Sequence, residues 1–193
     1  MLTPQLAINY LWFFWILTWI AAAFWSDRSA KRPALGAEVL YRVVTLAGAV
    51  LVFGIPVRSY DSPLILWSLG RDASWILLGL AGVGFLFAWW ARLTLGRLWS
   101  GWVSKKADHR VVDNGPYAIV RHPIYTGIIL AVFATAIIKG TAFALIGAGV
   151  MTLGFWIKAR LEERFLREEL GAESYDSYRR RVPMLVPFGR KAA

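Results

Sequence analysis

The polar side chains best suited to chemistry are concentrated in residues 115–125, which directly follow a turn signal at Asn114. This stretch contains two tyrosines, an arginine and His122, which is one of only two histidines in the chain. Pro123 suits the first position of a helix, where a missing N–H costs nothing, so we expect His122 at or near the N-cap. The positive end of such a helix offers unpaired N–H groups to an anion.

A second polar cluster follows about forty residues later and contains the adjacent carboxylates Glu162 and Glu163. Glu163 can pair with Arg167 at i+4 and with Arg160 at i−3, as on an ordinary solvated helix face, and we weigh this interpretation equally with a ligand contact. Glu162 lies one turn after Lys158 and beside an apolar stripe close to the membrane. A carboxylate there needs a partner, so we expect Glu162 to contact a ligand.

Several kinds of site are excluded by the residues that the chain lacks. There are no cysteines, which removes disulfides, thiolate metal sites and cysteine nucleophiles. Two histidines without a nearby constellation of carboxylates do not make metal-ligand spacing, so no metal is predicted. The net charge is +10, but the basic residues divide by membrane side, so we predict no nucleic-acid partner.

The elements that must position these clusters are membrane helices. Hydrophobic residues make up 58% of the 193 residues, above the roughly 45–50% of a soluble domain. We therefore predict an all-α integral membrane protein that forms one domain over residues 1–193. Residues 1–93 would hold three spanning helices and residues 94–193 the core that carries the chemistry. The expected spans are about 6–25, 39–57, 74–93, 125–138 and 141–157.

The basic residues predict how these spans are oriented. Of the 22 Lys and Arg residues, all but Arg58, Arg71 and Lys139 fall in alternate loops, just inside the spans that border those loops, or in the tail. By the positive-inside rule the N-terminus is outside, and the central segment and the C-terminus are cytoplasmic. The composition, rich in Ala, Trp and Arg, suggests a bacterial inner membrane.

The last two spans are each shorter than the roughly 20 residues of a spanning helix. Lys139 and Gly140 between them read as a tight turn, so we expect a hairpin that nearly spans. It returns the chain to the same membrane side, which would bring the two polar clusters into one site. A separate amphipathic helix is expected over 158–170, ending at Gly171, with Ser174 capping a further short helix.

The order of motifs resembles the isoprenylcysteine carboxyl methyltransferase family and, more widely, the membrane methyltransferases that include phospholipid N-methyltransferases. The resemblance covers about residues 88–188, whereas the first three spans are similar only in hydropathy. The motifs that carry it are Ala91-Arg-Leu-Thr-Leu-Gly-Arg-Leu-Trp-Ser100, His109-Arg-Val-Val, Gly115-Pro-Tyr, Arg121-His-Pro-Ile-Tyr, Glu162-Glu163, Tyr175-x-x-Tyr178 and Arg181-Val-Pro183.

This resemblance implies S-adenosyl-L-methionine as the cofactor, with Glu162 binding its methionine end and Glu163 as a further possible contact. It assigns a basic residue at the Lys158 position to the substrate, with Arg160 and Arg121 as further positioning residues. No residue is identified as catalytic, because an ionised carboxylate acceptor needs no base and the enzyme mainly aligns and desolvates two reactants. The residues implied to line the cofactor are His109, Arg110, Val111, Val112, Tyr117, His122, Pro123, Ile124 and Tyr125.

The sequence thus predicts methyl transfer to a lipid-like acceptor, foremost carboxyl O-methylation of a prenylcysteine-type substrate, with membrane lipid as a further partner. Three alternatives stay open: a phospholipid or other amine N-methyltransferase, an NADPH-dependent membrane reductase of the sterol type, and a non-catalytic membrane scaffold. The identity of the acceptor and the oligomeric state are not determined at this stage.

Overall fold

The structure, a computed structural model, describes residues 2–25, 35–54, 64–99 and 111–191. Over these ranges it is all-helical, with one isolated β-bridge between Ile65 and Thr141, and this confirms the predicted fold class. The helices are α1 (Pro4–Ala23), α2 (Leu35–Phe53), α3 (Arg71–Leu95), α4 (Pro123–Lys139), α5 (Ala142–Leu170) and α6 (Ala172–Arg181), with short 3-10 turns η1 (Gly96–Leu98) and η2 (Gly115–Ala118).

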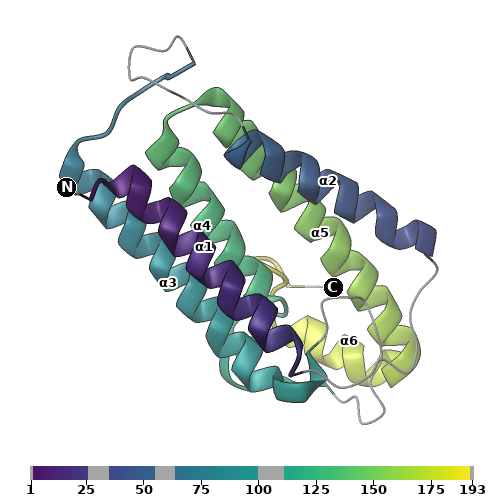
Figure 1. Cartoon of the computed structure of the whole chain (residues 1–193). Helices are drawn as coiled ribbons and strands as arrows, with labels where there is room; N and C mark the ends of the chain where they lie inside the picture. The colour runs from purple at the N-terminus through teal and green to yellow at the C-terminus, as the bar shows by residue number, and fades with distance from the viewer. Residues whose placement is uncertain (1, 26–34, 55–63, 100–110, 192–193) are drawn as a thin grey trace.

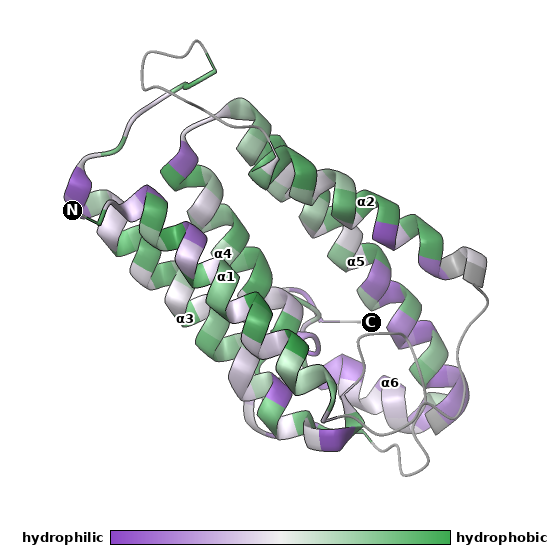
Figure 2. Ribbon diagram, viewed as in Figure 1, coloured by the Kyte–Doolittle hydropathy of each residue, from purple (hydrophilic) through white to green (hydrophobic). Residues whose placement is uncertain are grey.

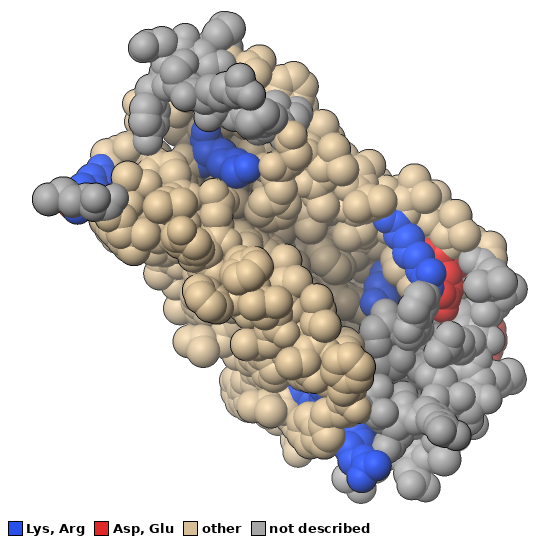
Figure 3. All heavy atoms as spheres, viewed as in Figure 1, with Lys and Arg blue, Asp and Glu red and all other residues tan. Residues whose placement is uncertain are grey.

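Among the described residues, three helical segments are long and apolar enough to cross a membrane: α1, α3 with η1, and α5. Helix α4 has 17 residues and is correspondingly short for a span. Apolar residues cover most of the length of the long helices (Figure 2), and the face in Figure 3 is almost free of charged side chains between the two ends of the molecule. The integral membrane class is supported in this way, while the count of five spans stays a prediction.

The helices pack as two pairs, α2 along α5 and α3 along α4, joined by contacts between α4 and α5 (Figure 1). Glycines permit the close approach in the α3–α4 pair. A Cβ atom on Gly84 would overlap the carbonyl oxygen of Gly127, and one on Gly127 would overlap that of Gly84. Gly79 and Gly82, which show the same small-residue pattern in the sequence, face open space.

The turn between α4 and α5 is as tight as the sequence predicts. Gly140 adopts a left-handed conformation at φ 65° and ends α4, and the Thr141 side chain caps α5 by accepting from the amide of Ala144. Leu66 donates its backbone N–H to the Gly140 carbonyl, which ties this turn to the segment before α3.

The antiparallel course of the helices gathers several termini at one end (Figure 1). The C-terminal ends of α1, α3 and α5 lie there, together with the N-terminal ends of α2 and α4 and with α6. The predicted break after Ile157 is wrong, because α5 continues from Ala142 to Leu170 as one helix. Gly171 ends α5 as expected, but it also serves as the N-cap of α6, so Ser174 does not cap that helix.

Candidate functional site

His122 is the N-cap residue of α4 and Pro123 is its first helical residue, as the sequence predicts. The chain that follows α6 holds the entry to this helix. Arg121 donates its backbone N–H to the Pro183 carbonyl at 2.9 Å, and His122 donates to the Met184 carbonyl at 3.1 Å. These two backbone contacts fix the chain directly before the His122 side chain.

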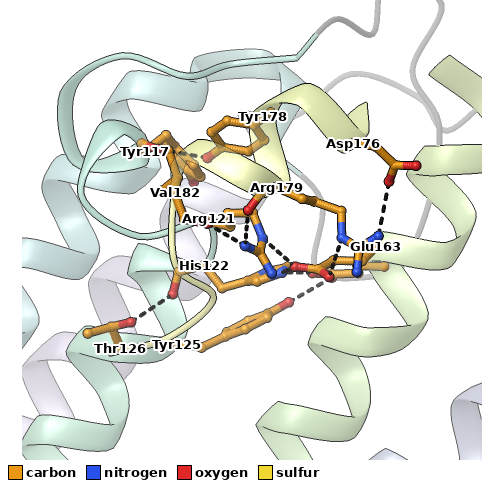
Figure 4. A network of polar contacts seen from close by, with 11 residues as sticks. Tyr117, Arg121, His122, Tyr125, Thr126, Glu163, Asp176, Tyr178, Arg179 and Val182 are labelled. Carbon is orange, nitrogen blue, oxygen red and sulfur yellow. Dashed lines mark hydrogen bonds and ion pairs between the residues drawn. The ribbon is translucent and has the colours of Figure 1, made fainter. Parts of the chain in front are cut away.

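The His122 ring lies between the two adjacent glutamates of α5. Its Nδ1 is 3.5 Å from Oε2 of Glu162, and its Nε2 is 3.3 Å from Oε1 of Glu163. Neighbouring helix residues point about 100° apart, so one imidazole can contact both carboxylates. Figure 4 shows His122 against Glu163. The expectation that the two polar clusters lie close together is confirmed.

The charge on His122 follows from these two contacts. Burial disfavours the charged ring, but the hydrogen bonds to Glu162 and Glu163 outweigh this and raise the pKa of His122 above its ordinary value. A neutral imidazole donates from only one nitrogen, whereas both nitrogens here face carboxylates. The geometry therefore favours an imidazolium that bridges the two glutamates.

Glu163 is a buried member of an ion network. Its side chain is 4% exposed, its Oε1 accepts from Nε of Arg121 at 2.6 Å, and its Oε2 lies 3.3 Å from Nε of Arg179. The interpretation of a solvated face that pairs Glu163 with Arg160 and Arg167 is wrong. Arg167 pairs instead with Asp176 of α6 at 2.8 Å, because α6 folds back against the end of α5.

Arg121 is held on its other side by the chain around the end of α6. One terminal nitrogen donates to the carbonyl oxygens of Val182 and of Arg179, the latter at 3.1 Å. The Tyr178 hydroxyl donates to the Tyr117 carbonyl at 2.7 Å and joins α6 to the turn before α4. Arg121 and Glu163 thus form a buried pair that is surrounded by protein groups (Figure 4).

Glu162 has a different environment. Its side chain is 18% exposed, and its Oε1 accepts from the Tyr125 hydroxyl at 2.6 Å and lies 3.9 Å from Nζ of Lys158. The Tyr125 ring is stacked between His122 and Phe155, with ring centroids 5.4 and 5.3 Å away. The hydroxyl that orients Glu162 is therefore itself fixed by packing.

Lys158 lies between two tyrosine rings. Its Nζ is 5.3 Å from the centroid of the Tyr125 ring and 5.5 Å from that of Tyr41, a residue of α2. Its side chain is 14% exposed. Arg160, the other basic residue predicted nearby, is exposed, and its guanidinium lies over the ring of Trp156 on another face of α5.

The remaining residues predicted to line the cofactor lie in packed positions. Tyr117 and Ile124 belong to the main apolar core, with Val112 packed against it, and Val111 packs against the small cluster of α6 that contains Tyr175. Pro123 is fully buried. His109 and Arg110 lie outside the described residues. A cofactor contact by any of these residues stays a prediction.

Sequence reasoning missed two groups at this site. Arg179 was not singled out because it lies in a run of three arginines at the end of α6, which resembles an ordinary charged helix end. Tyr41 belongs to an apolar helix that is distant in the sequence from both polar clusters, and no local pattern distinguishes it. Its neighbour Arg42, placed just inside a predicted span, was the one available signal.

The donor set fits S-adenosyl-L-methionine. The α-ammonium group of this cofactor requires a carboxylate that it can reach. Glu162 keeps part of its side chain accessible, whereas Glu163 does not.

A protein-family model matches the segment that contains these site residues. Residues 77–168 match the model of the isoprenylcysteine carboxyl methyltransferase (ICMT) family. This match confirms the resemblance that the motifs indicate, and it contains α4, the turn and most of α5.

Several of the named relatives are methyltransferases. The chain is 45% identical over 137 residues, 68% of its length and 50% of the relative's, to a methanethiol S-methyltransferase of a Pseudomonas species. It is 34% identical to methanethiol S-methyltransferase 2 of Bradyrhizobium diazoefficiens, over 65% of the chain and 51% of that protein. It is 26% identical to protein-S-isoprenylcysteine O-methyltransferase B of Arabidopsis thaliana, over 69% of the chain and 71% of that protein. The chain spans about half the length of the two methanethiol enzymes.

Proposed function

We propose, from the membership of residues 77–168 in the isoprenylcysteine carboxyl methyltransferase family, that this protein is a membrane methyltransferase. It transfers a methyl group from S-adenosyl-L-methionine to a lipid-like acceptor, and the acceptor group is a carboxylate of the prenylcysteine type. The observation that carries the proposal is the pair of unlike glutamates: a partly exposed Glu162 held by three neighbours beside a buried and neutralised Glu163.

S-adenosyl-L-methionine, when bound, supplies a methyl group on a sulfonium, which is activated for in-line displacement. Glu162 would hold its ammonium group, because this carboxylate combines negative charge with access. Tyr125 and His122 contact Glu162 from two directions and limit how far the carboxylate can rotate. Such preorganisation reduces the entropy lost when two reactants are aligned.

The Arg121–Glu163 pair helps to position His122 next to Glu162. Arg121 balances the charge of Glu163 directly, so the imidazolium of His122 can act on Glu162 without leaving a buried carboxylate uncompensated. Arg121 thus acts as a positioning residue through Glu163 and His122. In this assignment Arg121 does not contact the acceptor.

Lys158 would attract the anionic group of the acceptor. A carboxylate is already ionised at neutral pH and needs no base. An amine acceptor must first lose a proton, and as a cation it would be repelled by the ammonium of Lys158. The site therefore favours a carboxylate over the amine of a phospholipid. Figure 3 shows the surface hollowed between α1 and α2, with mostly uncharged residues around the hollow, which suits the approach of a lipid-like acceptor from the membrane.

A second candidate function is S-methylation of a small thiol. It is favoured by the identities of 45% and 34% to methanethiol S-methyltransferases, both higher than the 26% to the plant isoprenylcysteine enzyme. A thiolate is also an anion, and Lys158 would stabilise it in the same way. The two candidates share the cofactor and differ in the acceptor alone.

A labelled-methyl transfer assay on membranes tests the proposal. The acceptors are a farnesylcysteine analogue, methanethiol and phosphatidylethanolamine, each with labelled S-adenosyl-L-methionine. Wild type is compared with Glu162→Gln and with the matched control Glu168→Gln, which alters an exposed carboxylate of the same helix. We expect transfer to farnesylcysteine that Glu162→Gln reduces and Glu168→Gln does not. Transfer to methanethiol alone would select the second candidate. Binding of NADPH without binding of S-adenosyl-L-methionine would contradict both and favour the reductase.

A further inference from the structure

Helix α2 contributes to the site although it lies outside the segment that matches the family. Its Tyr41 is 6% exposed and turns its ring toward Lys158, whose Nζ lies 5.5 Å from the ring centroid. Tyr125 of α4 faces the same ammonium from 5.3 Å. A cation within about 6 Å of a ring centroid is attracted by that ring. Three helices therefore meet at this one charged group.

The position of Tyr41 is set by close backbone packing between α2 and α5. A Cβ atom on Gly48 would overlap the backbone of Met151, and a Cβ atom on Gly154 would overlap Thr45. These contacts leave no room to slide α2 along α5 by one residue. Tyr41 lies one turn before Thr45 and so is held in a fixed register opposite Lys158.

An ion pair on α2 contacts the hydroxyl of Tyr41. Glu38 is buried and pairs with Arg42 at i+4, and Nε of Arg42 donates to the Tyr41 hydroxyl at 3.4 Å. Both Glu38 and Arg42 also act on Lys158 through Coulomb interactions. The hydroxyl end of Tyr41 is thus anchored while its ring face is presented to the ammonium.

We propose that Tyr41 is a positioning residue that, with Tyr125, holds the Lys158 ammonium where the anionic group of the methyl acceptor binds. Ring faces attract an ammonium without accepting one particular N–H. The two rings therefore restrain the position of the Lys158 charge. This inference rests on the proposed function and extends the acceptor site to a helix that the family match does not include.

The experiment compares Tyr41→Leu, which removes the ring, with Tyr41→Phe, which keeps it and removes the hydroxyl. Tyr41→Leu should raise KM for the anionic acceptor about tenfold, the equivalent of a partly desolvated cation–π contact. The same variant should change the Kd for S-adenosyl-L-methionine by less than about twofold, since Tyr125 and His122 still hold Glu162. Tyr41→Phe should restore KM to nearly the wild-type value.

Two further measurements separate positioning from a general loss of packing. Val52→Ala truncates another buried residue at the far end of α2 and should leave KM unchanged. In a Lys158→Met background, Tyr41→Leu should add almost nothing to KM, because the two residues act as a unit. If Tyr41→Leu does not accumulate in membranes, Tyr41→Met gives the same comparison with a more adaptable side chain.

The outcomes distinguish this inference from the function on which it rests. Absence of methyl transfer by wild type to every acceptor would reject the proposed function and the inference together. The inference alone would be overturned if wild type is active and both Tyr41→Leu and Tyr41→Met keep the wild-type KM for the acceptor. An equal KM effect of Tyr41→Leu with and without Lys158 would also overturn it.

Discussion

Glu162 and Glu163 are neighbours in the chain, but their surroundings are nearly opposite. Glu163 faces α6 and the loop before α4, where Arg121, Arg179 and His122 enclose it at 4% exposure. Glu162 faces Tyr125 and Lys158 and keeps 18% of its side chain exposed. A rotation of one residue along α5 thus separates a carboxylate that supports the fold from one that a ligand can reach. The difference lies in which elements cover each face of the helix.

The largest expected effect is on stability and comes from the buried side. Glu163→Ala leaves the Arg121 guanidinium buried without its counter-charge, so the protein should lose about 3–5 kcal/mol of unfolding free energy. Thermal unfolding in detergent measures this loss. The matched control is Glu168→Ala at an exposed position of α5, which should change stability by no more than about 0.5 kcal/mol. Equal melting temperatures for the two variants would contradict the assignment of Glu163 to the structural side.

The next largest effect is on cofactor binding and comes from the partly exposed Glu162. Glu162→Gln keeps the shape of the side chain and removes its charge, so it should weaken S-adenosyl-L-methionine binding by about 1.5–3 kcal/mol. It should lower the melting temperature much less than Glu163→Ala, because Glu162 is partly solvated. Isothermal titration with the cofactor tests this. If Glu163→Gln binds S-adenosyl-L-methionine more weakly than Glu162→Gln does, Glu163 is the ligand contact and Glu162 the structural residue.

The charge of His122, which bridges both sides, predicts a pH dependence. Its carboxylate partners raise the pKa of the folded ring above the ordinary value despite burial. The stabilisation is therefore fully present below the unfolded pKa of about 6.5 and is lost as the pH rises through the folded pKa, at about 1.4 kcal/mol per pKa unit of elevation. Melting temperatures of wild type and His122→Gln should converge between pH 6 and the folded pKa. A gap that widens with pH would show that the ring is neutral in the folded protein.

The smallest effect concerns the contact that joins α6 to the loop before α4. Tyr178→Phe removes the hydrogen bond to the Tyr117 carbonyl and should cost about 1 kcal/mol of stability. The cofactor Kd should stay at the wild-type value, since the contact lies on the Glu163 side. Tyr10→Phe, at an exposed position of α1, is the control for loss of a hydroxyl. A change in cofactor affinity without a change in melting temperature would place Tyr178 on the ligand side.

Local chemistry at single residues accounts for what could be predicted from the sequence. Pro123 starts α4, Gly140 ends it and Gly171 ends α5, because a missing N–H or a missing Cβ acts on the backbone wherever the residue occurs. The break predicted after Ile157 failed for the same reason. The residues from Phe155 to Leu170 change in polarity but include no glycine or proline, so the helix continues.

The chain by itself therefore determined the helical class, the start of α4, the ends of α4 and α5, and the meeting of two polar clusters across the α4–α5 turn. Only the tertiary structure decided which glutamate is enclosed by arginines and that Tyr41 of α2 faces Lys158. Those outcomes depend on α6 folding back on α5 and on glycine contacts that set the register of α2. Burial and ion pairing are properties of the neighbours brought together by packing, and residues distant in the sequence supply those neighbours.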